Sequence, residues 1–133
     1  MGGSQTLNIA VPGLTDYAYV GVFSSGLIGG GGGRGRGAAP AADTAQPAGP
    51  PPPFGEAWEK RNLAMLDNTA AKKGLKLLWF STGKDDFLLE TTRSTVELLK
   101  RHGFTPQYTE SAGGHTWLNW RDYLSQFAPL LFQ

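Results

Sequence analysis

The chain has 133 residues, 12 Lys and Arg against 11 Asp and Glu, two His and no Cys. This length suits one domain, and a net charge of +1 argues against a dedicated nucleic-acid binder or a polybasic membrane anchor. The lack of cysteine excludes a disulfide framework and a thiol nucleophile, and two widely separated histidines predict no metal site and no cofactor. No apolar run has the roughly 18 residues of a membrane span, and the first residues do not form a signal-peptide pattern.

Strand and helix signals alternate along the chain. Residues 1–10 are typical of a helix start with no strand before it. Two apolar runs, 19–25 and 75–81, are typical of buried parallel strands, and 105–111 is a weaker third strand. Three further segments carry apolar side chains at helical spacing: 56–73, 87–102 and 117–132. This order predicts an α/β fold with about three parallel strands, flanking helices and right-handed crossovers.

A composition break separates the first strand from the next helix. Residues 26–55 hold ten of the 19 glycines and six of the nine prolines. Such a segment has too few large apolar groups to offset the entropy of ordering it. We therefore expect a disordered, low-complexity insertion at 29–53.

The first predicted strand is apolar on both faces yet has no strand before it in the chain. It would lie at an edge of the sheet, where its unpaired backbone groups could pair with another polypeptide. The chain thus has the pattern of the second half of a domain.

Polar residues with catalytic chemistry follow two of the strands. Asp85 and Asp86 come after the second strand, and His115 follows the third in a Gly-Gly turn. Active sites of parallel sheets lie at the carboxyl ends of the strands, and an acid followed by a histidine matches the last two members of a Ser, Asp, His series. The ordinary alternatives are a helix cap for either aspartate and a loop residue for His115. His102 is interpreted as a capping residue at a helix end.

The last helix carries a stripe of apolar residues at steps of three and four: Trp117, Trp120, Leu124, Phe127 and Leu131. Tryptophans near an active site can stack on sugar rings. At this spacing we interpret both tryptophans as core residues instead.

Five stretches of the chain resemble one known family. They are Met1-Gly-Gly-Ser-Gln-Thr-Leu-Asn-Ile, Tyr19-Val-Gly-Val-Phe-Ser-Ser-Gly, residues 75–88, Gly113-Gly-His-Thr-Trp-Leu-Asn-Trp-Arg-Asp-Tyr-Leu and Phe127-Ala-Pro-Leu-Leu-Phe. The chain resembles the esterase D-like, family-one carbohydrate esterases, a group with feruloyl and acetylxylan esterases, over residues 1–28 and 54–133. Their serine lies in Gly-x-Ser-Met-Gly-Gly-x-Gln, so Met1 corresponds to the residue directly after it. The resemblance implies part of an α/β-hydrolase fold.

The resemblance also implies roles for individual residues. Asp86 would be the orienting acid with Asp85 as the fallback, His115 the base, and the Met1 amide an oxyanion donor in the intact enzyme. The family's serine has no counterpart here. Ser4 comes close to a Gly-x-Ser-x-Gly motif, but three preceding residues form no strand to hold it, so we place it in the first turn of a helix and keep the nucleophile role as the alternative.

We therefore expect residues 1–133 to be the C-terminal part of one α/β-hydrolase domain. By resemblance it belongs to a serine carboxylic-ester hydrolase for small-molecule or plant-polysaccharide esters, acetyl or feruloyl, that is extracellular or periplasmic when intact. The chain alone would be inactive. One alternative is an inactive, esterase-like binding or interaction module, and another is a sequence that begins at an internal methionine of a longer reading frame. No nucleic acid or membrane partner is expected.

Overall fold

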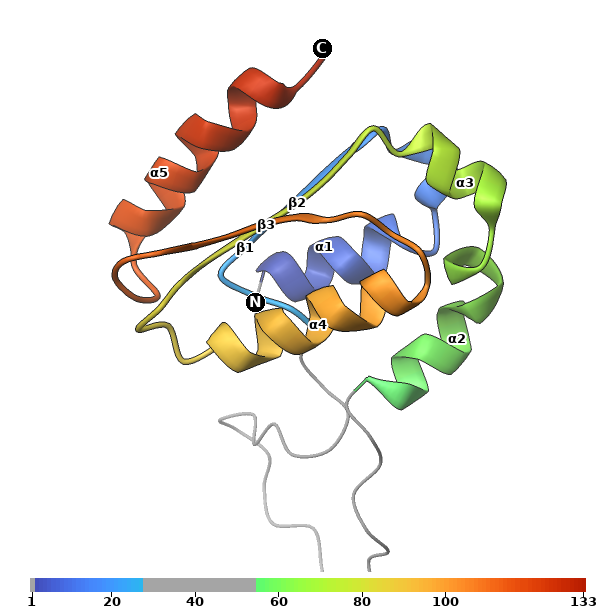
Figure 1. Ribbon diagram of the computed structural model, residues 1–133, viewed down its shortest axis with the longest axis horizontal. Helices are drawn as coiled ribbons and strands as arrows, with labels where there is room; N and C mark the ends of the chain where they lie inside the picture. The colour runs from blue at the N-terminus through green and yellow to red at the C-terminus, as the bar shows by residue number, and fades with distance from the viewer. Residues whose placement is uncertain (1, 28–54) are drawn as a thin grey trace, which may run out of the picture.

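The computed structural model describes residues 2–27 and 55–133 (Figure 1). Its helices and strands are α1 (Gly2–Ala10), β1 (Tyr19–Phe23), α2 (Glu56–Leu66), α3 (Thr69–Gly74), β2 (Leu77–Gly83), α4 (Leu89–Arg101), β3 (Gln107–Ser111) and α5 (Trp117–Phe127). Short 3-10 turns cover Leu14–Asp16 and Ala128–Leu130. The predicted insertion at 29–53 lies outside the described residues, and so does Met1.

The three strands form one parallel sheet in the order β1-β2-β3. Val22 of β1 pairs with Phe80 of β2, and Ser81 of β2 pairs with Thr109 of β3. Every residue of β2 is buried, because this strand has a neighbour on each side and helices on both faces. The predicted α/β architecture is confirmed, and β1 lies at an edge of the sheet among the described residues, as its position in the chain predicted.

Alternating side chains divide the core into two layers. Leu78 and Phe80 of β2 face a large cluster with side chains of α1, α2 and α4. Leu77 and Trp79 point to the opposite face, where they meet Tyr123 of α5. Figure 1 shows this arrangement, with α5 alone on one side of the sheet and α1 and α4 on the other. No helix in the described part of the chain is long and apolar enough to cross a membrane.

The predicted helix at 56–73 is wrong in one respect, because the structure has two helices there. Asn68 has an extended backbone, and its side-chain oxygen accepts a hydrogen bond of 3.0 Å from the Ala71 amide. Asparagine side chains commonly cap helix starts in this way. The cap starts a new helix, α3, at Thr69, although the apolar spacing continues across it.

The predicted apolar stripe of α5 is partly wrong. Trp120 and Phe127 pack against the core, but Trp117 is 69% exposed and Leu124 is 54% exposed. Tyr123, which the prediction passed over, is fully buried against Trp79. The buried face of α5 therefore shares Trp120 and Phe127 with the face that hydropathy alone selects, but it includes Tyr123 in place of Trp117 and Leu124.

Candidate active site

Two loops at the carboxyl edge of the sheet meet through backbone hydrogen bonds. Lys84, just after β2, donates to the carbonyl of Ser111 at 2.9 Å, and the Asp85 amide donates to Gly113 at 3.0 Å. Gly83 permits this approach, since a Cβ there would lie 2.0 Å from the Gly113 oxygen. The ends of β2 and β3 are therefore locked together, and each carries one of the predicted site residues.

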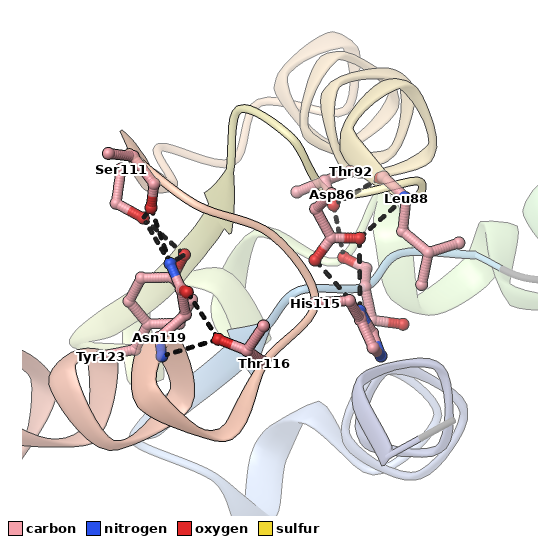
Figure 2. A network of polar contacts seen from close by, with 10 residues as sticks. Asp86, Leu88, Thr92, Ser111, His115, Thr116, Asn119 and Tyr123 are labelled. Carbon is pink, nitrogen blue, oxygen red and sulfur yellow. Dashed lines mark hydrogen bonds and ion pairs between the residues drawn. The ribbon is translucent and has the colours of Figure 1, made fainter.

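Asp86 and His115 contact each other directly (Figure 2). His115 Nδ1 lies 3.0 Å from Oδ2 of Asp86 and 3.2 Å from Oδ1. The Leu88 amide donates to the same Oδ1 at 2.8 Å, which fixes the carboxylate at the entry to α4. The Asp86 side chain is 0% exposed and the His115 ring 25% exposed. A buried carboxylate on Nδ1 holds an imidazole with its Nε2 directed away, the arrangement that proton transfer at Nε2 requires.

Aromatic rings flank the imidazole and a cavity lies beside it. The Phe87 ring centre is 4.7 Å from that of His115, and Trp120 meets the ring edge-on at 5.0 Å. In Figure 2 the second ring nitrogen of His115 points toward α1. A cavity of about 350 Å³ opens there, and its lining includes His115, Trp120, Phe23, Ser24, Gly2 and Gly3.

A polar cluster on α5 holds the loop that carries His115. Asn119 Nδ2 donates to the Ala112 carbonyl at 2.8 Å and to the Ser111 hydroxyl at 3.1 Å. The Tyr123 hydroxyl lies 2.7 Å from that of Ser111, and Thr116 accepts from the Asn119 amide as the N-cap of α5. Figure 2 shows these contacts on the left, away from Asp86. This support was not predicted from the sequence, although Thr116 and Asn119 have the three-residue spacing of a helix cap.

The structure does not bring the other predicted residues to His115. Asp85 is exposed and contributes its backbone amide to the contact with Gly113. Ser4 lies in the first turn of α1, where its carbonyl accepts from the Asn8 side chain, and it does not line the His115 cavity. Met1, the predicted oxyanion donor, lies outside the described residues.

Ser24 is a residue of the site that the sequence analysis did not select. It follows β1, lines the cavity with His115 and has a φ of +47°. The signal in the sequence was slight: two serines and a glycine directly after an apolar strand. Within residues 2–27 and 55–133, no group of three or more His, Asp or Glu is arranged to hold a metal ion.

Comparisons with known proteins agree with an esterase-like α/β fold. No protein-family model matches the chain. Over 63 residues it is 32% identical to an acetyl esterase from Caldicellulosiruptor saccharolyticus, a match that covers 47% of this chain and 24% of that protein. Its structure resembles that of a ferulic acid esterase with a TM-score of 0.61 and 19% identity, over 98% of this chain and 48% of the other. The chain thus spans about half the length of the ferulic acid esterase.

Proposed function

We propose that this chain is the C-terminal half of a serine carboxylic-ester hydrolase and supplies the acid and the base of its catalytic triad. The observation that carries the proposal is the contact of 3.0 Å between Asp86 and His115, with the rest of the imidazole facing a cavity. Asp86 fixes the ring tautomer and stabilises the imidazolium. His115 takes the proton of the attacking serine and returns it to the leaving alcohol. The similarity to an acetyl esterase and to the fold of a ferulic acid esterase supports acetyl or feruloyl esters as substrates.

The nucleophile, in this proposal, comes from polypeptide ahead of α1. A strand that leads into α1 and crosses over to β1 would lie beside β1, because such crossovers are right-handed and join neighbouring strands. Its carboxyl end would then lie at the start of α1. The His115 cavity includes Gly2 and Gly3 of that first turn, so a serine there would face the imidazole.

The test is a hybrid protein in which this chain replaces the matching half of the ferulic acid esterase. We expect it to hydrolyse 4-nitrophenyl acetate, and we expect His115→Ala to lower kcat at least about 1000-fold. Asp86→Asn should lower kcat by roughly 10⁴-fold, since the amide of the new side chain favours the wrong tautomer of the His115 ring. Asp85→Asn is the matched control, because this neighbouring carboxylate is exposed, and it should retain activity.

Several outcomes would contradict the proposal. If the His115→Ala hybrid keeps its activity, His115 is not the catalytic base. If Asp85→Asn abolishes the activity and Asp86→Asn does not, the acid of the triad is Asp85. Turnover by the 133-residue chain alone, together with fluorophosphonate labelling, both abolished by Ser4→Ala, would make Ser4 the nucleophile. A folded but inactive hybrid that still binds esters would favour the alternative of an esterase-like binding module.

A further inference from the structure

Ser24 occupies the carboxyl end of β1 within the candidate site. Its amide donates to Ser81 of β2 at 2.7 Å, so the hydrogen-bond ladder of the sheet extends to this residue. The next stretch of chain turns away toward α4. Ser24 therefore sits at the same edge of the sheet as the loops with Asp86 and His115, and it lines the cavity that His115 lines.

The backbone of Ser24 is strained. Its φ of +47° lies in the left-handed region, where the Cβ of an L-residue meets the following carbonyl oxygen. Neighbouring contacts impose this conformation, because Thr92 donates to the Ser25 carbonyl at 3.1 Å and the Leu27 amide donates to Thr95 at 2.9 Å. Both threonines are fully buried in α4. Strain that the surroundings enforce is found preferentially at active sites and ligand clamps.

The Ser24 side chain is also unpaired. The residue is 1% exposed, and its hydroxyl has no hydrogen-bond partner among the described residues. Buried hydroxyls are nearly always bonded, because an unbonded one loses its hydration without compensation. The hydroxyls of Ser25 and Thr82 are also unpaired, but neither residue lines the cavity. Of the three residues, Ser24 alone lines the cavity. Because its hydroxyl oxygen is itself buried, a rotation of the side chain about χ1 would be needed to bring the hydroxyl to a ligand there.

We propose that Ser24 is a substrate-binding residue whose hydroxyl donates a hydrogen bond to an oxygen of the ester held beside His115. Ester oxygens only accept hydrogen bonds, so the serine is the donor. The aromatic walls formed by Phe23 and Trp120 suit an ester with an aromatic group. The ester as ligand rests on the proposed function; the strain and the unpaired hydroxyl do not.

The first experiment measures binding of phenyl acetate to the 133-residue chain, by the backbone amide shifts of Gly3, Gly21 and His115. We expect Ser24→Ala to weaken binding about fivefold or more, the loss of one hydrogen bond. Ser25→Ala is the matched control, since it removes an unpaired buried hydroxyl that does not line the cavity. It should bind phenyl acetate as the parent chain does.

The second experiment measures thermal stability without ligand. Ser24→Ala removes a hydroxyl that has no partner, so its Tm should equal or exceed that of the parent chain. Ser111→Ala removes a hydroxyl bonded to Tyr123 and Asn119, and its Tm should fall. A lower Tm for Ser24→Ala would show that the hydroxyl supports the fold, and this would overturn the inference.

The remaining outcomes separate this inference from the proposed function. Equal binding of phenyl acetate by Ser24→Ala and the parent chain, or no binding by either, overturns the role of Ser24. The hybrid esterase then decides the proposed function independently. In the hybrid, Ser24→Ala should raise KM or lower kcat, and His115→Ala should lower kcat as described above. If Ser24→Ala has no effect on the hybrid but His115→Ala abolishes its activity, the proposed function stands and the role of Ser24 does not.

Discussion

At the scale of single residues, the Tyr123 hydroxyl joins the core to the loop that carries His115. Its ring is fully buried, while its oxygen reaches Ser111 at 2.7 Å and Asn119 at 3.2 Å. Tyr123→Phe keeps the packing and leaves both partners without this bond. We expect a loss of about 1 to 2 kcal/mol in the free energy of unfolding, measured by urea denaturation.

A second tyrosine provides the control for this prediction. Tyr17 is exposed, so Tyr17→Phe should stay within about 0.5 kcal/mol of the parent chain. Equal stability of the two variants would mean that the polar cluster on α5 does not hold the His115 loop. Activity of the hybrid esterase should then also be the same in both.

The residues of the candidate site differ in how far the sequence could reveal them. Asp86 and His115 each follow a strand, and parallel strands bring their carboxyl ends to one edge, so their contact followed from chain order. Ser24 also follows a strand. What singles it out is a positive φ and an unpaired hydroxyl, and both depend on contacts with α4 that no local pattern encodes.

At the scale of elements, one histidine ties α4 to α2. His102, the C-cap residue of α4 as predicted, places Nε2 2.7 Å from Glu59 and Nδ1 2.9 Å from Asp67. Arg101 lies 3.8 Å from Glu59, and Lys72 of α3 donates to the His102 carbonyl. A neutral imidazole has one N–H, so both carboxylates are bonded only when the ring is protonated.

This contact predicts that stability falls as pH rises. Burial opposes the charge, but the hydrogen bonds to Asp67 and Glu59 outweigh it and raise the pKa of His102 above its ordinary 6.5. The contribution is therefore fully present below about pH 6.5 and is lost as the pH rises through the folded-state pKa. Between about pH 6 and pH 9, we expect the free energy of unfolding of the parent chain to fall by about 1 kcal/mol more than that of the His102→Gln variant.

The Gln variant isolates the imidazole, because every other titrating group is common to both proteins. Urea denaturation at several pH values gives the comparison. Parallel pH curves for the parent chain and His102→Gln would show that the two carboxylates do not depend on the charge of the ring.

Element boundaries were predicted less well than element types. The apolar spacing at 56–73 is continuous across Asn68, so periodicity indicated one helix. The capping bond from Ala71 is a short-range polar interaction that hydrophobic spacing does not register. Similarly, the choice between Tyr123 and Leu124 as the buried residue of α5 depends on where the sheet lies, and the helix sequence does not contain that information.

At the scale of the whole molecule, one edge of the sheet is formed by β1. Among the described residues β1 pairs only with β2. A groove of about 410 Å³ runs beside that edge, and its lining includes Ile9, Tyr17 and Gly21. The sequence predicted this edge because the strand is apolar and residues 1–18 contain no strand signal.

Amide hydrogen exchange tests whether this edge is free in the chain and covered in the hybrid esterase. Alternate amides of a strand point to opposite edges, and the Ser24 amide points to β2. The amides of Val20 and Val22 therefore also face β2, while those of Gly21 and Phe23 face the open edge.

In the 133-residue chain we expect the amides of Gly21 and Phe23 to exchange at least about 100-fold faster than that of Val22. In the hybrid all three should be protected, because the strand that carries the nucleophile would pair with β1. Slow exchange of Gly21 in the chain alone would mean that another segment or a second copy already covers the edge, and fast exchange in an active hybrid would place the nucleophile on a strand elsewhere.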